Sequence, residues 1–276
     1  PFVEFRDYGS ISRSSLLAML QTANPGVPLT DAAQVWVERL LVGPGGGGAY
    51  YMEDMMSEPD APFGWGGGGY PGCWRYDEFG LGEIPEDGVD IMIGAGGMSG
   101  DTYGNATEWW TSTGVVSVPG GVAPYHSMTD IRLRLRQQAW YGNELQMPFG
   151  IGTWSSPDLE PALLGNGRGP GMGGHLINEI GSGRGAMRGG DAMLARTELT
   201  TNGGWAGDAT TPAEDGSDAL PDEFWSFGAG GGATNDDNDN GGNGGYPGGG
   251  GGSASAMPGE GAGGCCRLRF WAWTGA

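Results

Sequence analysis

Residues 244–252 read G-G-Y-P-G-G-G-G-G, and the first five letters of this stretch recur at residues 68–72. Further runs of four glycines lie at residues 45–48 and 66–69. The chain has 60 glycines and 18 prolines among 276 residues, a share in the range that usually indicates disorder. Aromatic residues stand beside the runs, however, which a flexible linker would not need: Trp65, Tyr70, Trp74, Tyr246, Trp271 and Trp273. The runs therefore predict an ordered part of the fold.

Ordering a glycine-rich chain is costly. Fixing a glycine costs about 0.5–1 kcal/mol more than fixing an alanine, so the 11 tryptophans, 9 tyrosines and 8 phenylalanines must be largely buried to offset that cost. A glycine run can adopt the polyproline II helix, which has three residues per turn and no internal hydrogen bonds. Without side chains, such helices can approach closely enough to bond to one another's backbones. We therefore expect a mainly β and irregular fold, in which short strands alternate with packed glycine helices.

Five segments are predicted as strands because they are rich in β-branched, aromatic and other apolar residues. For residues 34–43, Q-V-W-V-E-R-L-L-V-G, a helix capped by Thr30 is the alternative. Residues 131–136 alternate isoleucine or leucine with arginine, the pattern of a half-buried strand whose arginines pair with acids or face solvent. The five segments are 34–43, 89–93, 115–118, 131–136 and 267–273.

One short helix is predicted near the N-terminus. Ser12 or Ser14 can cap it, and Asn24-Pro25-Gly26 ends it. Its apolar side chains are Leu16, Leu17, Met19 and Leu20. Residues 1–33 therefore form either an arm that docks on another protein or a helix folded onto its own domain. Residues 34–276 form a glycine-rich structural domain.

The charge of the chain excludes several classes of partner. All 13 basic residues are arginine, and they face 33 acids, which gives a net charge of −20. Nucleic acid and anionic membranes both require a basic surface. No apolar stretch is long enough to span a bilayer, and the N-terminus lacks the basic and apolar regions of a secretion signal. We expect a protein that is made in the cytoplasm and does not insert into membranes.

No residue pattern predicts a catalytic, cofactor or metal site. The only histidines, His126 and His175, have no recognisable nucleophile arrangement around them. The acids are numerous enough for a glycosidase-like pair, but none is singled out. Residues 94–100, G-A-G-G-M-S-G, follow a strand, but Ser99 takes the place of the third glycine of a dinucleotide loop.

Two features leave alternatives open. Residues 236–241, D-D-N-D-N-G, match the first half of a calcium loop, but Pro247 stands where the loop needs glutamate, so a solvated acidic turn is the alternative. Cys73, Cys265 and Cys266 lack the spacing of a zinc site or a disulfide framework. This favours buried thiols in a reducing compartment, and a bridge from Cys73 to one of the pair is the alternative.

The order of strands and glycine blocks resembles the glycine-rich domain of bacteriophage tail fibres and related virion proteins. In that family an apolar strand runs into a glycine block, and further strands and blocks follow in a set order. The matching segments here are 35–48, 66–69, 91–97, 104–107, 115–121, 248–252, 261–264 and 267–271. Residues 122–164 fit poorly, and the first 30 residues have no counterpart.

The resemblance implies a non-enzymatic virion protein, a tail fibre or tail-tip component that presents loops to a host receptor or to neighbouring subunits. It implies a homo-oligomer, often a trimer in such fibres, that is joined to other virion proteins through its N-terminal arm. Three alternatives stay open: a head fibre, decoration or neck protein; a tail-associated glycan depolymerase; and a free ice-binding protein. The acid excess and the lack of a secretion signal count against the last.

Overall fold

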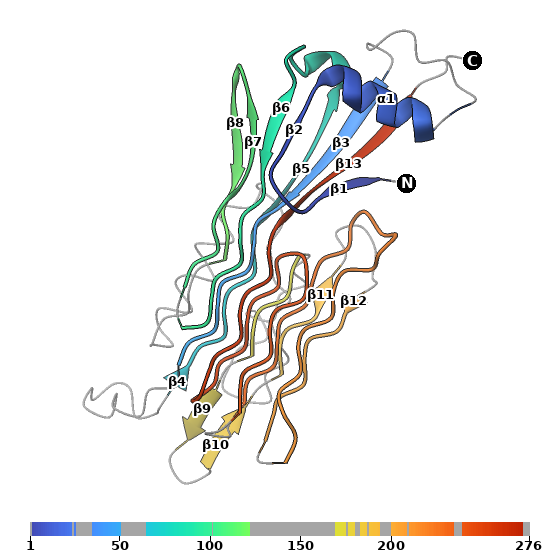
Figure 1. Cartoon of the computed structure of the whole chain (residues 1–276). Coiled ribbons are helices and arrows are strands. Elements are labelled where there is room, and N and C mark those ends of the chain that lie inside the picture. Colours follow the sequence, from blue (N-terminus) through green and yellow to red (C-terminus); the bar gives the residue numbers. More distant parts are fainter. Residues whose placement is uncertain are drawn as a thin grey trace.

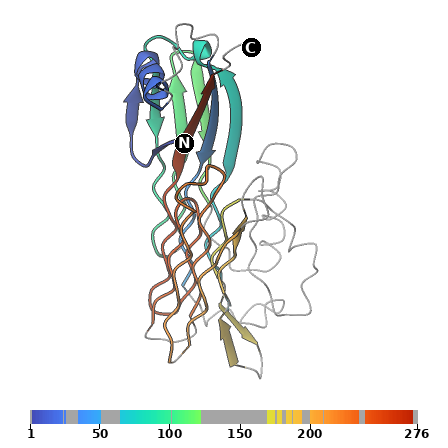
Figure 2. The ribbon, with the colours of Figure 1, turned by 90° about the vertical axis from the view of Figure 1, so that its right-hand side faces the viewer.

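The computed structural model describes residues 2–23, 25, 35–50, 65–100, 102–121, 169–174, 176–179, 183–186, 188–193, 200–208, 210–234 and 239–272. These residues form a β-sandwich with one α-helix and one 3-10 helix, Leu81–Glu83, and, below it, a bundle of long glycine segments that run side by side (Figure 1). A view from the side shows the bundle as an extension of the sandwich along one axis (Figure 2). The predicted class, mainly β with one short helix, is confirmed.

Each sheet of the sandwich has four antiparallel strands. Sheet A has the order β1-β13-β3-β5, with β1 (Val3–Phe5), β13 (Cys265–Ala272), β3 (Val35–Val42) and β5 (Trp74–Gly80). Sheet B has the order β2-β6-β7-β8, with β2 (Gly9–Ile11), β6 (Val89–Met92), β7 (Thr107–Thr111) and β8 (Gly114–Val118). Elsewhere β4 (Trp65–Gly66), β9 (Leu176–Glu179) and β10 (Gly183–Ala186) form a small sheet, and β11 (Ala192–Met193) pairs with β12 (Thr200–Thr201).

In sheet A, the strands β3 and β13 are buried on both faces over much of their length. The core between the sheets includes Val37, Leu41, Cys266 and Leu268 from sheet A, and Val89, Ile91, Trp109 and Val118 from sheet B. On its other face sheet A packs Leu40, Val42 and Cys265 against Phe224, Trp225 and Phe227. Because most of β3 is buried on both faces, its sequence is apolar except at Glu38 and Arg39 and does not alternate.

The predicted N-terminal helix is α1 (Arg13–Ala23). Its cap is Ser12, whose hydroxyl accepts a hydrogen bond from the N–H of Ser15 at 3.1 Å. Leu16 and Leu20 are buried in the sandwich core. Of the two alternatives for the N-terminal segment, the described residues therefore fit a helix folded onto its own domain.

The first strand is also tied into the body. β1 pairs with β13, and β2 pairs with β6. Arg267 on β13 is buried and donates to the Glu4 carboxylate at 2.6 Å. The same guanidinium donates to the carbonyls of Phe224 and Ser226 at 3.1 and 2.5 Å. Residues 2–23 thus belong to the same hydrogen-bonded sheets as the strands that follow.

Four predicted strands are confirmed, with ends that shift by up to two residues: β3, β6, β8 and β13. The helix considered for residues 34–43 is wrong. The segment 131–136 lies outside the described residues. The sequence did not predict β5, W-R-Y-D-E-F-G, or β7, T-E-W-W-T, because charged residues interrupt their alternation.

The glycine segment that follows β3 shows how the bundle is held. The N–H groups of residues 45–49 donate in turn to three different neighbouring segments. Residues three apart donate to the same segment. The acceptors, in order, are the carbonyls of Ala262, Tyr70, Thr102, Gly259 and Gly67, at 2.8–3.0 Å. A polyproline II helix has three residues per turn and so turns every third residue to the same side. The bonding pattern is the one expected for packed glycine helices.

The glycine helices continue the register of the strands. In sheet A, Val42 pairs with Cys265. Gly45 lies three residues after Val42, and Ala262 lies three residues before Cys265. The N–H of Gly45 donates to the carbonyl of Ala262, so the same pairing continues beyond the strands. The pairing of β3 with β5 continues in the same way. Each sheet of the sandwich therefore runs on into a layer of glycine helices.

Three of the described segments exchange backbone hydrogen bonds with six neighbours each: residues 43–49, 226–234 and 248–254. The neighbours of 248–254 are 43–49, 66–72, 169–174, 226–234, 239–247 and 257–264. Such close packing leaves no room for side chains. A Cβ placed on Gly250 would lie 2.0 Å from the carbonyl oxygen of Gly69, and one on Gly45 would lie 2.0 Å from that of Gly249.

Acids close the bundle at its surface. Asp215 accepts the N–H of Asn243 at 2.6 Å, and Asp218, three residues on, accepts the N–H of Tyr246 at 2.7 Å. Asp191 accepts the N–H of Gly203 at 2.8 Å. These carboxylates satisfy backbone donors that would otherwise need a further glycine helix. Part of the acid excess is explained by this role.

We expect Gly261→Ala to destabilise the protein by about 3 kcal/mol or more, because the new Cβ would lie 2.2 Å from the carbonyl oxygen of Gly45. The matched control is Gly263→Ala in the same tract, where the nearest atom, the Gly94 oxygen, lies at 3.7 Å. It should change the free energy of unfolding by less than about 1 kcal/mol. Denaturant titration measures both, and equal losses would contradict close backbone packing.

The three cysteines are unbridged and buried, as the sequence favoured. Burial raises the pKa of Cys73 to about 11 and that of Cys265 to about 12, and it also raises the pKa of Cys266. We expect no reaction of the native protein with a thiol reagent at pH 8, and three reactive thiols once it is unfolded without reductant. A single reactive thiol after unfolding would instead indicate a disulfide.

Candidate functional site

Five residues that the sequence suggested for chemistry lie outside the described residues: His126, His175 and residues 236–238. Asp239, which is described, accepts the N–H of Ala213 at 3.3 Å. No group of three or more histidine, cysteine or acidic side chains that could hold a metal ion occurs in the part of the chain that the structure describes. The calcium loop therefore stays a sequence prediction.

The run at residues 94–100 belongs to the bundle. The N–H of Gly97 donates to the carbonyl of Gly45 at 2.8 Å, and that of Gly100 donates to Gly48 at 3.1 Å. A phosphate-binding loop needs such N–H groups directed at a ligand. Here they are used by a neighbouring glycine helix, in accord with the missing third glycine.

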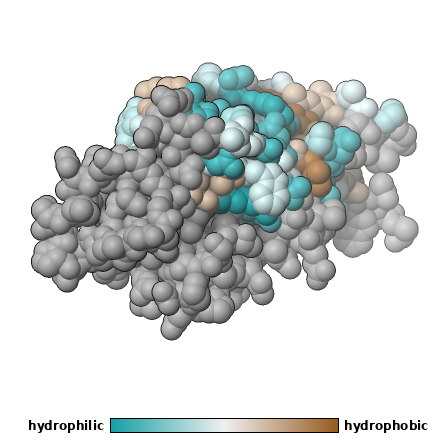
Figure 3. Space-filling view, turned by 90° about the horizontal axis from the view of Figure 1, so that it is seen from below, coloured by the Kyte–Doolittle hydropathy of each residue, from teal (hydrophilic) through white to brown (hydrophobic). Residues whose placement is uncertain are grey.

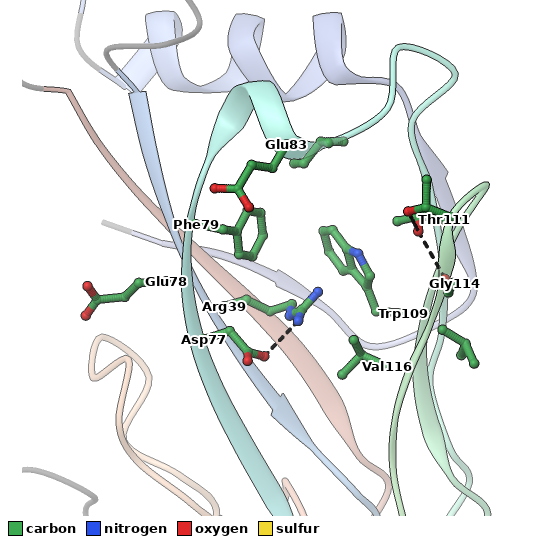
Figure 4. A pocket seen from close by; sticks show the side chains of 12 residues that line it. Arg39, Asp77, Glu78, Phe79, Glu83, Trp109, Thr111, Gly114 and Val116 are labelled. Carbon is green, nitrogen blue, oxygen red and sulfur yellow. Dashed lines mark hydrogen bonds and ion pairs between the residues drawn. The ribbon is translucent and has the colours of Figure 1, made fainter.

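A cleft of about 370 Å³ opens along one side of the sandwich, between the edge strands β5 and β8 (Figure 4). Arg39, Asp77, Phe79 and Trp109 form its inner part, and Thr111, Gly114 and Val116 lie on the β7–β8 side (Figure 4). This cleft was not predicted from the sequence, because two of the strands that build it, β5 and β7, were not predicted.

Arg39 is the central group of the cleft. Its side chain is 7% exposed and forms an ion pair with Asp77 at 2.7 Å. The guanidinium carbon lies 5.1 Å from the ring centre of Phe79 and 4.8 Å from that of Trp109, so aromatic faces stabilise the charge further. Its Nε is buried and has no hydrogen-bond partner among the described residues.

The Asp77 carboxylate is held in its ionised form. Burial alone would raise the pKa of Asp77, but hydrogen bonds from Arg39 and Arg75 and the charges of both arginines outweigh it and leave the pKa below its ordinary value. Arg75 donates to the same carboxylate at 3.0 Å. The cation at the base of the cleft is therefore already neutralised by a neighbouring acid.

The hydroxyls of the cleft are also engaged. Thr111 donates to the carbonyl of Gly114 at 3.0 Å and lies 3.0 Å from the Thr113 hydroxyl. Among the residues that line the cleft, none places a nucleophile beside a base. The arrangement instead links the two sheets, because Arg39 on β3 packs against Trp109 on β7.

A second polar cluster lies on the other face of sheet A. The Tyr76 hydroxyl lies 2.8 Å from Glu38 and also bonds to Glu78, and Arg269 donates to Glu38 at 2.9 Å. Burial and the two carboxylates raise the pKa of Tyr76. These residues come from β13, β3 and β5, so the cluster joins three neighbouring strands side to side.

A third candidate is the surface formed by turns between the glycine segments. Tyr50, Met98, Tyr103 and Met257 are exposed there. The backbone of Tyr50 forms an isolated β-bridge with Ala254, and the Tyr50 ring lies against Gly100. Seen from below, the described surface is largely hydrophilic, with small hydrophobic areas (Figure 3). Exposed aromatic and methionine side chains on such turns suit contact with another macromolecule.

No family model matches the chain, and no curated protein matches it. In the described residues no helix is long and apolar enough to cross a bilayer.

We expect Asp77→Asn to destabilise the protein by about 3 kcal/mol at pH 7, because it leaves the buried Arg39 charge without its acid. The pKa of Asp77 is lowered in the folded state, so its contribution is complete above the unfolded pKa of about 4 and is lost as the pH falls through the folded value. The variant should therefore lose less stability than the wild type when the pH drops from 5 to 2.

The matched control is Glu86→Gln, which removes an ion pair to Arg13 whose acid is 89% exposed. It should cost less than about 1 kcal/mol. Chemical unfolding at several pH values measures both variants. Equal effects at pH 7 would contradict the structural role of the Arg39 cluster.

Proposed function

We propose that the chain is a structural protein of a bacteriophage virion, most simply a tail fibre or tail-tip component. The observation that supports this proposal is the bundle of glycine helices, with three segments that are each hydrogen-bonded to six neighbours. Together with the order of strands and glycine blocks in the sequence, it fits a stiff body that holds loops at a fixed distance from their attachment point.

The physical basis of this role is stiffness without side-chain packing. Where glycine helices meet inside the bundle, the contacts are backbone on backbone, so there are few rotamers to rearrange. Bending the bundle would break hydrogen bonds in several directions at once, since consecutive residues bond to different neighbours. The turns at its surface, with Tyr50, Met98, Tyr103 and Met257, are then presented to a host surface or a neighbouring subunit.

Attachment to the particle is proposed to use the sandwich. The described residues of the expected N-terminal arm are folded into sheets A and B, so a docking surface near the N-terminus is built from a folded element and not from a free arm. The exposed Met19 on α1 lies in this region. A homo-oligomer, such as the trimer common in fibres, stays part of the proposal.

The proposal is tested on particles of the phage that encodes the chain, purified by density-gradient centrifugation. Mass spectrometry should find the protein in the particles, and immunogold electron microscopy should place it on the tail or its fibres. Label on the head or neck would instead support a head fibre, decoration or neck protein. Absence of the protein from purified particles would overturn the proposal.

A further inference from the structure

The outer face of sheet B has an exposed aromatic surface. The outward-facing residues of its four strands are Ser10, Asp90, Met92, Glu108, Trp110, Val115 and Ser117, and Tyr8 precedes the first strand. Tyr8 is 66% exposed, Val115 48%, Met92 46% and Trp110 44%. In the described residues this face is not covered by another element, whereas part of the outer face of sheet A packs on Phe224, Trp225 and Phe227. Exposed aromatic side chains grouped on one face mark interaction sites.

Trp110 is held in a fixed orientation. Its indole N–H donates to the Glu108 carboxylate at 2.9 Å, and Ser117 donates to the other oxygen of that carboxylate at 3.1 Å. Trp110 and Ser117 both flank Glu108, the former on the same strand and the latter across the β7–β8 pair. The ring is therefore a pre-oriented platform, which lowers the entropy cost of binding a ligand on it.

Beside this platform lies a carboxylate with spare hydrogen-bonding capacity. Asp90 is exposed and is the direct cross-strand partner of Trp110. Directly opposed residues in an antiparallel pair have Cβ atoms about 4.5–5.5 Å apart. Among the described residues, the Tyr8 hydroxyl donates to the Asp90 carboxylate, with 3.4 Å between the two oxygens. The carboxylate is thus flanked by two aromatic rings and has further acceptor sites open.

Charge and area narrow the class of ligand. The described outward-facing residues include two acids and no base, so an anionic ligand would be repelled. Four strands of at most five residues cover roughly 250 Å², from spacings of about 4.8 Å between strands and 3.4 Å along them. A stable protein–protein interface needs about 800 Å² on each partner. A small uncharged ligand with an apolar face and paired donors fits better than a protein.

We propose that this face, with Trp110, Asp90 and Tyr8, is a binding site for neutral glycans. The C–H face of a sugar ring would stack on Trp110, and a pair of neighbouring hydroxyls would donate to Asp90. Tyr8 would contact the sugar ring from the other side of Asp90. This inference deepens the proposed function, because it names the class of host-surface ligand that a virion protein would recognise.

The test uses the purified full-length protein on an array of neutral and acidic bacterial oligosaccharides, followed by saturation-transfer NMR and tryptophan fluorescence with the best neutral ligand. We expect Trp110→Ala to weaken binding at least tenfold and Asp90→Ala at least fivefold. The matched control is Trp36→Ala, which removes a tryptophan of similar exposure, 40%, from sheet A and should change the affinity less than twofold. Thermal melting checks that each variant is folded.

If Trp110→Ala does not fold, Trp110→Phe serves as the test of glycan binding at this site. It keeps an aromatic ring but loses the hydrogen bond to Glu108, so it should weaken binding at least threefold. The inference is overturned if no neutral glycan on the array binds, or if Trp110 variants bind as well as the wild type. Binding of an arginine hexapeptide through Trp110, without any neutral glycan, would also overturn it. Glycan binding by a protein that is absent from virions would sustain this site and reject the virion role.

Discussion

The rest of the structure depends on the absence of a Cβ atom where glycine helices meet. In the bundle, carbonyl oxygens of one helix occupy the space that a neighbour's Cβ would need, at about 2 Å for Gly45 and Gly250. This approach lets each helix hydrogen-bond in several directions, which a strand, with its donors in one plane, does not do. The glycines are therefore not a flexible tract, because their backbone donors and acceptors are used up by other segments of the same chain.

The sandwich and the bundle are one hydrogen-bonded system. Side chains lie between the layers of the sandwich, and backbone atoms are in direct contact between the layers of the bundle. Stacked sheets lie about 10 Å apart because side chains stand between them, whereas the glycine layers pack by direct backbone contact. The β3–β13 register passes without a break from Val42 into Gly45. The aromatic and aliphatic residues are thus concentrated where the layers are separated, and they supply the burial that offsets the cost of ordering the glycines. Two buried arginines also join elements that backbone pairing alone does not join, since Arg39 packs on Trp109 of sheet B and Arg267 donates to the carbonyls of Phe224 and Ser226.

Much of this could be predicted from the sequence, and the limits have physical reasons. The strands β3 and β13 were readable because they are buried on both faces over much of their length. The glycine blocks were readable because runs of glycine allow close backbone packing. The strand β5 was not, since Asp77 and Glu78 resemble loop residues until Arg39, Tyr76 and their partners are placed beside them. The cleft and the outer face of sheet B depend on cross-strand neighbours, such as Asp90 with Trp110, and register is not visible in a single sequence.

In the proposed role the protein is a rigid rod, stiffened by backbone hydrogen bonds, with its recognition residues on the turns and the sandwich surface. That the glycine segments hold one another is tested most directly by hydrogen–deuterium exchange of the native protein, resolved to the amides of residues 45–48 and 249–252. These amides should exchange as slowly as those in the middle of β3 and β13, because they open only when the body unfolds. Exchange at the rate of an unstructured peptide would contradict the claim that the glycine segments hold one another.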